Sequence, residues 1–237
     1  MKILLIRHGD PDYEHDSLTE KGRREAALLC DRLLDMNVRE CYVSPLGRAQ
    51  ATIRPFLEKT GQTARTIPWM REFPVFELDE YTNTTHVAWD YYPRYRGRFP
   101  EWNSTENWMD AHPFNQWGTR PLVEEMWNGL DGILDGYGYH REGQFYRVDR
   151  PNRDTIAMVC HFGAGSILLS HLLNVSAMQL LHTTFMAPAS VTTVVTEERE
   201  RGTAQWRTTV LGDVSHLVNA GEPMSLSGFF RETFDEV

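Results

Sequence analysis

The stretch KILLIRHG, residues 2–9, sets a short apolar run directly against an arginine and a histidine. A run of this length with an abrupt polar end is typical of a strand in a parallel sheet, because helices cover both faces of such a strand. Ligands of these sheets bind beyond the carboxyl ends of the strands. We therefore expect Arg7 and His8 to lie at the mouth of a binding site.

The residues that follow repeat this pattern of a strand and then a helix. Ser17 or Thr19 can cap a first amphipathic helix, in which apolar residues recur at helical spacing up to position 36. Residues 40–43 predict a second strand, and a turn then leads into a helix over residues 48–59. Arg48 therefore stands at a helix start beside a strand end.

A third unit comes late in the chain. Residues 155–160 predict a buried strand that ends at His161, and a helix follows over residues 163–173. Two further strands, over residues 190–196 and 205–211, form a hairpin-like pair that closes the core. His161 thus repeats the placement of His8.

These units predict an α/β fold, with a mostly parallel central sheet flanked by helices in a single three-layer domain over residues 1–237. An aromatic and proline-rich insertion over about residues 73–119 interrupts the pattern, and a helix resumes from Pro121. Loops of this length are usually lids or binding loops, so we expect this insertion to form a lid.

Composition limits the class of partner. The net charge of -9 repels nucleic acid, anionic membranes and phosphorylated metabolites alike, so we expect neither nucleic acid nor membrane as partner. A small phosphorylated metabolite, the partner expected from the motifs described below, would need a local cationic pocket. The opening apolar run is too short for a secretory signal, and no run is long enough to cross a membrane. The three cysteines lack a CxxC pair, which favours reduced core thiols in the cytoplasm. The oligomeric state stays open.

Two guanidiniums and two imidazoles are expected to meet at these strand ends. An arginine matches phosphate oxygens with a planar fork, and a helix start adds backbone amides to the same anion site. A neutral imidazole can attack phosphorus if its other nitrogen keeps a proton held by a backbone acceptor, which forms a phosphohistidine. A leaving alkoxide then needs a proton, and Glu72 is the candidate donor, with Glu77 and Asp79 as alternatives.

The motifs together resemble the histidine phosphatase superfamily, the phosphoglycerate-mutase-like group. The resemblance rests on RHG at 7–9, SPLGRAQAT at 44–52, VCH at 159–161 and LGDVSHL at 211–217. The insertion is unmatched, and the chain has Phe162 where many relatives have glycine. It also has Glu14 where relatives have a phosphate-binding asparagine.

The resemblance implies a role for each site residue. His8 would be the phosphorylated nucleophile, Arg7, Arg48 and His161 would hold the phosphoryl group, and Glu72 would donate the proton. It implies a phosphomonoester hydrolase that needs neither metal nor cofactor. The chain lacks the sequence motif that is typical of glycolytic mutases around the position of Glu72, so we expect a phosphatase. A phosphoglycerate-mutase-type transferase and a non-catalytic phosphate-binding regulatory module are the alternatives.

Plainer interpretations accompany these roles. Arg7 and Arg48 could simply form ion pairs with Asp10 or Asp12, and Glu72 could be an ordinary solvated carboxylate. The acidic run from His8 to Asp16 could suggest a metal site, but its spacing follows no familiar ligand motif. Residues 91–99 interleave aromatics with arginines, as surfaces for single-stranded nucleic acid do, although the overall acidity favours a lid.

Overall fold

The computed structural model describes residues 1–74 and 87–230. Its centre is an 8-stranded sheet, which β1 (Lys2–Arg7) enters near the middle. The strands lie in the order β5 (Ala64–Thr66), β4 (Val38–Val43), β8 (Thr155–Cys160), β1, β9 (Val191–Glu200), β10 (Thr203–Asp213), β7 (Phe145–Val148) and β6 (Tyr139–Glu142).

The direction of each strand follows from its pairings. β1 pairs in parallel with β8, β8 with β4, and β4 with β5, whereas β9, β10, β7 and β6 are joined by antiparallel pairings. β10 and β6 consequently run in the same direction as β1, and only β9 and β7 run against it within the sheet described. The expected mostly parallel sheet is confirmed.

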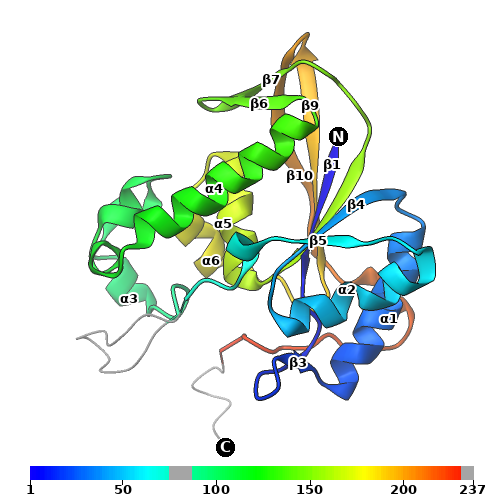
Figure 1. Cartoon of the computed structure of the whole chain (residues 1–237). Coiled ribbons are helices and arrows are strands. Elements are labelled where there is room, and N and C mark those ends of the chain that lie inside the picture. Colours follow the sequence, from blue (N-terminus) through cyan, green and yellow to red (C-terminus); the bar gives the residue numbers. More distant parts are fainter. Residues whose placement is uncertain (75–86, 231–237) are drawn as a thin grey trace, which may run out of the picture.

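Helices cover both faces of the sheet (Figure 1). One face carries α1 (Glu20–Leu34) and α2 (Gly47–Thr60), and the other carries α4 (Thr119–Gly136), α5 (Phe162–Leu173) and α6 (Ala177–Thr183). Alternate residues of β1 pack on opposite faces of the sheet. Ile3 and Leu5 belong to the apolar cluster under α4 and α5, whereas Leu4 and Ile6 belong to the cluster under α1 and α2. Burial on both faces explains the unbroken apolar run of this strand.

The start of α1 is fixed by a side-chain cap. The Thr19 hydroxyl accepts a hydrogen bond from the amide of Gly22 at 3.1 Å, so Thr19 and not Ser17 is the cap. Ser17 instead lies in β3 (Ser17–Leu18), which pairs with β2 (Pro11–Asp12). The loop that follows β1 is thereby held against α1, close to the carboxyl ends of the parallel strands.

The strands β6 and β7 were not expected from the sequence. Their four-residue segments carry several charged residues, so the alternation of apolar and polar side chains is too short to stand out. The pairing of β7 with β10 and of β6 with β7, together with the burial of Tyr139 and Tyr146, stabilises them.

The described part of the aromatic stretch contains a run of short helices. These are α3 (Pro93–Arg96), η2 (Pro100–Asn103), η3 (Asn107–Asp110) and η4 (Phe114–Trp117). Trp102, Trp108 and Phe114 are buried in the apolar cluster that also contains residues of α4 and α5. This segment therefore packs into the core, while its expected action as a lid stays a prediction.

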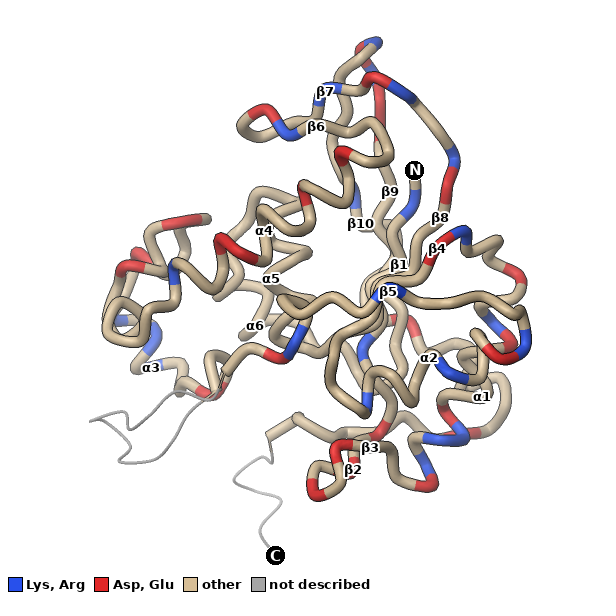
Figure 2. The backbone as a smooth tube through the Cα atoms, viewed as in Figure 1, with Lys and Arg blue, Asp and Glu red and all other residues tan. Residues whose placement is uncertain are grey.

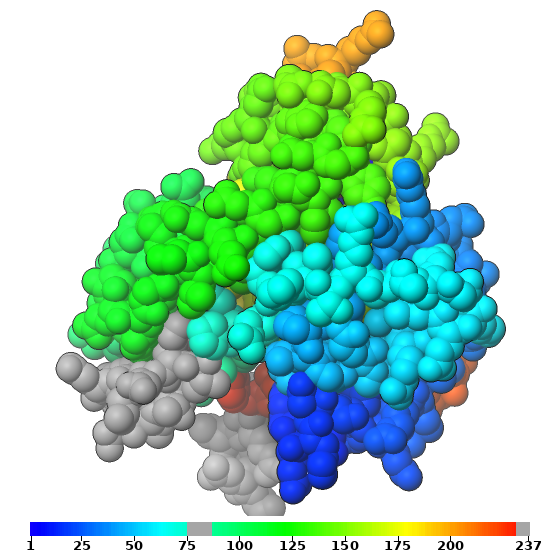
Figure 3. Space-filling view, in the orientation of Figure 1, coloured from blue at the N-terminus to red at the C-terminus, as the bar shows by residue number. Residues whose placement is uncertain are grey.

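Charged residues of both signs are interspersed over the elements (Figure 2). On the face shown in Figure 3, the segment that follows α2 packs between the N-terminal region and α4.

Within the ranges that the structure describes, no helix has the length and apolar character needed to cross a membrane. Cys30, Cys41 and Cys160 are free and buried, as expected.

Candidate active site

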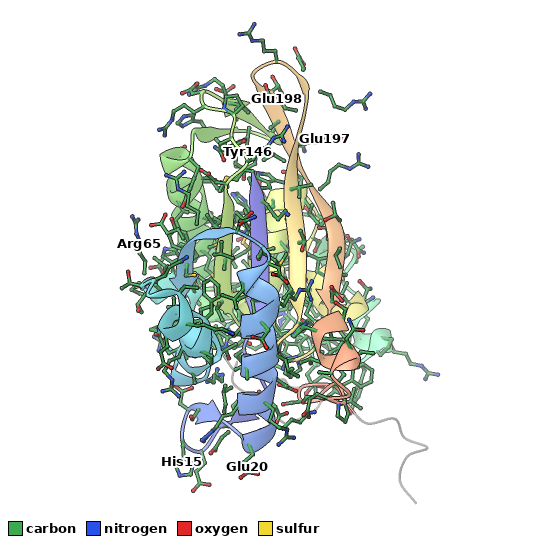
Figure 4. All side chains as sticks on the ribbon, turned by 90° about the vertical axis from the view of Figure 1, so that its right-hand side faces the viewer. His15, Glu20, Arg65, Tyr146, Glu197 and Glu198 are labelled. Atoms are coloured by element: carbon green, nitrogen blue, oxygen red, sulfur yellow. The ribbon has the colours of Figure 1, made fainter. Side chains whose placement is uncertain are left out.

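The three parallel strands that end in the predicted motifs are neighbours in the sheet, in the order β4, β8, β1. His15 and Glu20, which follow β1 in the chain, mark this end of the molecule in Figure 4, opposite Glu197 and Glu198, which lie in β9 near its turn into β10. The rings of His8 and His161 lie 5.1 Å apart between centroids, at an angle of 57°. The strand order thus brings both histidines together.

His8 is held in one tautomer by its own neighbour. Its Nδ1 lies 2.7 Å from the carbonyl oxygen of Gly9, which can only accept, so Nδ1 carries the proton and the Nε2 lone pair is left available. Burial, with the nearby positive charges of Arg7 and Arg48, lowers the pKa of His8 to about 3. The ring is therefore neutral near pH 7, as a nucleophile requires.

His161 follows β8 directly and is the residue before the first turn of α5. It is buried, with Nε2 2.7 Å from the hydroxyl of Ser44. Burial and the proximity of His8, Arg48 and Arg7 lower its pKa, so this ring is also neutral.

Arg7 is the last residue of β1 and is 6% exposed. Its two terminal nitrogens donate to the carbonyl oxygens of Met186 and Ser227, each at 2.8 Å. The ring centroids of Phe162 and Phe185 lie 5.9 and 5.8 Å from the guanidinium carbon. These contacts hold the guanidinium in one orientation, and it forms no ion pair with Asp10 or Asp12.

Arg48 lies in the first turn of α2 and pairs with Asp16, at 2.6 Å. The other oxygen of Asp16 accepts the amide of Gly47 at 2.6 Å, so one carboxylate fixes both the helix start and the arginine. A side chain at Gly47 would collide with the backbone of Asp16, since its Cβ would lie 2.2 Å from that carbonyl oxygen. Sequence reasoning missed Asp16, because no local pattern links it to a residue 32 positions away.

Three nitrogens of this site are buried and have no hydrogen-bond partner among the described residues: Arg7 Nε, Arg48 Nε and His161 Nδ1. Buried polar groups in folded proteins are almost always paired, because each unpaired one costs about 1–3 kcal/mol. The guanidinium nitrogens can only donate. Their gathering beside a neutral imidazole is what a site for an oxyanion requires.

The Glu72 side chain packs against the first turn of α5, beside the same site. Its Oε1 accepts the amides of Phe73 at 2.8 Å and Ala164 at 3.0 Å, and its Oε2 accepts the amide of Gly163 at 3.4 Å. Burial raises the pKa of Glu72, although the backbone donors and Arg7 oppose this shift. Glu72 is thus not a plain solvated carboxylate; the alternatives Glu77 and Asp79 lie outside the described residues.

Aromatic side chains line the site next to Glu72. Trp89 packs edge-on against Phe162, with ring centroids 5.3 Å apart, and Phe162 is the first residue of α5. The phenylalanine that departs from the family pattern therefore forms a wall beside Arg7.

The C-terminal segment, residues 222–230, is a further part of the site that the sequence did not indicate. Glu222 binds Lys21 and Arg24 of α1, and the Ser225 hydroxyl donates to Asp10 at 2.5 Å. Ser227 then places its carbonyl against Arg7. In the sequence, Gly228 is a signal of this close contact, because a Cβ there would lie 2.9 Å from the Arg7 guanidinium.

The acidic run of the first loop is occupied by hydrogen bonds within the protein. Asp10 accepts from Thr19 and Ser225, Asp12 pairs with His15, and Asp16 pairs with Arg48. In the described part of the chain, no three His, Cys, Asp or Glu side chains are grouped closely enough to hold a metal ion.

Comparison with known proteins identifies the family. The family model of the histidine phosphatase superfamily (branch 1) matches residues 3–128. A probable phosphatase of Schizosaccharomyces pombe is 37% identical over 67 residues, which cover 24% of this chain and 32% of that protein. The match thus spans about a third of the length of this curated relative.

Solved structures share the fold at low identity. Phosphoserine phosphatase from Entamoeba histolytica, in complex with phosphoserine, is 19% identical with a TM-score of 0.60, covering 91% of this chain and 98% of its own. A mycobacterial glucosyl-3-phosphoglycerate phosphatase is 21% identical with a TM-score of 0.59, and the matched regions cover 89% of this chain and 98% of that one.

Proposed function

The chain belongs to the histidine phosphatase superfamily, and from this premise we propose that it hydrolyses phosphomonoesters through a phosphohistidine on His8. One observation carries the proposal: Arg7, Arg48 and His161 lie near a neutral His8 whose Nε2 lone pair is available, and each has a buried nitrogen without a partner among the described residues. They suit the oxygens of a phosphoryl group, and Nε2 suits attack on its phosphorus.

The first half-reaction transfers the phosphoryl group to the protein. The Nε2 lone pair of His8 forms a bond to phosphorus while the ester P–O bond breaks. Gly9 holds the proton on Nδ1, so the imidazolium that forms keeps its hydrogen bond to the backbone. Arg7 and Arg48 stabilise the charge that builds on the phosphoryl oxygens.

Glu72 is the proposed proton donor to the departing alkoxide. Burial favours its neutral form, and Oε2 is the better place for the proton, because its contact with Gly163 is long at 3.4 Å. In the second half-reaction water attacks the phosphohistidine, Glu72 takes a proton from that water, and the P–N bond breaks with its electron pair returning to Nε2.

The charge for this chemistry comes from the protein. Two guanidiniums at the phosphoryl group supply the positive charge that a divalent ion provides in metal-dependent phosphatases. We therefore propose that catalysis is independent of added metal.

The proposed substrate is a small phosphorylated metabolite. Two of the similar structures are named for phosphoserine and glucosyl-3-phosphoglycerate phosphatases, which fits this class. Trp89, Phe162 and Phe185 favour a leaving group with an apolar or ring-bearing face, because aromatic walls stack on such groups and exclude water.

Two alternatives make different demands on the site. A mutase needs further cationic groups for the second anionic end of its substrate, and the first loop supplies mainly acidic residues near Arg48. A regulatory module would bind phosphate without turnover. Such a module needs no proton donor, whereas here Glu72 is held against the first turn of α5.

Release of phosphate from p-nitrophenyl phosphate tests the proposal. We expect turnover by the wild type, with and without EDTA, inhibition by vanadate and loss of turnover in His8→Ala. Phosphate binding without turnover would favour the regulatory module, and loss on chelation with recovery on added metal would contradict metal independence.

A further inference from the structure

Ser44 links the end of β4 to His161. Its amide donates to the carbonyl of Val159 at 2.9 Å, which ties it to the end of the neighbouring strand β8. Its side chain is fully buried, and its Oγ lies 2.7 Å from Nε2 of His161. The hydroxyl therefore has a fixed place beside the ring.

The direction of this hydrogen bond follows from the acceptor that the hydroxyl hydrogen of Ser44 needs. The amide of Leu46 donates to Ser44 Oγ at 3.3 Å, so the oxygen already accepts one hydrogen bond. A serine hydroxyl has one hydrogen to donate. Of the neighbours described, His161 Nε2 is the acceptor within reach of that hydrogen.

This direction decides the tautomer of His161. A neutral imidazole carries one proton, so a ring that accepts at Nε2 must carry the proton at Nδ1. Nδ1 is the buried nitrogen of His161 that has no partner in the described part of the chain. The ring consequently has one donor left, at the nitrogen turned away from Ser44.

We propose that Ser44 is a positioning residue, which holds His161 in the Nδ1–H tautomer so that His161 donates a hydrogen bond to the phosphoryl group. The phosphoryl ligand in this statement rests on the function proposed above, whereas the tautomer stands on the hydrogen-bond geometry. In the opposite tautomer a lone pair at Nδ1 would face the phosphoryl oxygens and repel them. Ser44 acts through His161 and need not touch the substrate.

Removal of the hydroxyl should weaken phosphate binding without unfolding the protein. In Ser44→Ala, His161 is free to exchange tautomers, and we expect affinity for inorganic phosphate and kcat/KM to fall about 10- to 100-fold, the value of one hydrogen bond to a charged group. Ser44→Cys keeps a weak donor of similar size and should lie between the two.

The matched control is Ser170→Ala on α5. Ser170 is also fully buried, but its hydroxyl donates to the carbonyl of Ile167 within the same helix. This variant removes the same atoms from the core and leaves the site unchanged, so its phosphate affinity should match that of the wild type.

Long-range ¹H–¹⁵N spectra of ¹⁵N-histidine-labelled protein read the tautomer directly, with the His161 signals assigned from their loss in His161→Gln. We expect the Nδ1–H form in the wild type and a mixture in Ser44→Ala. An Nε2–H form in the wild type would overturn the proposal without any variant, as would equal phosphate affinity in Ser44→Ala and Ser170→Ala. Absence of phosphatase turnover alongside the expected tautomer and phosphate binding would instead count against the proposed function.

Discussion

Glu72 reaches the start of α5 only because residue 163 is a glycine. A Cβ on Gly163 would lie 2.7 Å from Glu72 Oε1 and 2.6 Å from the ring of Trp89. Gly165, two residues further along α5, has room for a side chain, because its Cβ would meet only the Cys160 sulfur at 3.6 Å.

Gly163→Ala should therefore displace Glu72, while Gly165→Ala should not. We expect kcat on alkyl phosphates to fall roughly 10- to 100-fold in Gly163→Ala, the usual cost of a misplaced catalytic group, and to stay near the wild-type value in Gly165→Ala. Both variants gain helix propensity equally, so equal activities would show that the position of Glu72 is not critical.

Glu72→Gln should separate substrates by their leaving groups. Alkyl phosphates need a proton at the departing oxygen, so their kcat should fall about 100-fold or more, whereas p-nitrophenyl phosphate should lose less than about tenfold. With the wild type, turnover of alkyl phosphates should fall as the pH rises through the raised pKa of Glu72, because the carboxyl then loses the proton it donates. Equal losses on both substrates would assign the acid to another residue.

The phosphohistidine itself can be trapped. Brief incubation with a ³²P-labelled phosphomonoester should give a labelled protein that is stable in alkali and labile in acid. His8→Asn should carry no label and should lose roughly a thousandfold or more in turnover. Label that persists in His8→Asn would rule out His8 as the site.

The depressed pKa of His8 also predicts how stability depends on pH. The unfolded chain binds a proton at His8 near pH 6.5, whereas the folded protein does so only near pH 3, so acid favours the unfolded state across this window. Between pH 7 and pH 5, the wild type should lose about 2 kcal/mol more of its unfolding free energy than His8→Asn. Urea titrations measure this difference, and parallel pH profiles for the two proteins would contradict it.

Incubation of 3-phosphoglycerate with catalytic 2,3-bisphosphoglycerate distinguishes a phosphatase from a mutase. We expect phosphate release, faster from aromatic phosphates, and no isomerisation, because the aromatic walls near Arg7 suit an apolar leaving group better than a second anion. Arg94, Arg96 and Arg98 are the residues that could serve a second phosphate. Isomerisation faster than hydrolysis would make the mutase interpretation right.

The sequence by itself was enough to place Arg7, His8, Arg48 and His161. Each follows a strand whose apolar run is visible in the chain, and parallel neighbours bring their carboxyl ends to one edge of the sheet. The backbone acceptor for His8 was expected as a class, and the structure identifies it as Gly9. These features depend on short-range patterns, which explains why they can be read from the chain.

Only the tertiary structure decided which partners complete the site. The pairs Arg48 with Asp16, Glu72 with Ala164, and Arg7 with Ser227 join residues 32, 92 and 220 positions apart. No local periodicity records such contacts, because they form when separate elements pack against the same sheet edge. The pairing of β7 with β10, and of β6 with β7, was hidden for the same reason: segments this short gain their stability from the sheet that they join and not from their own sequence.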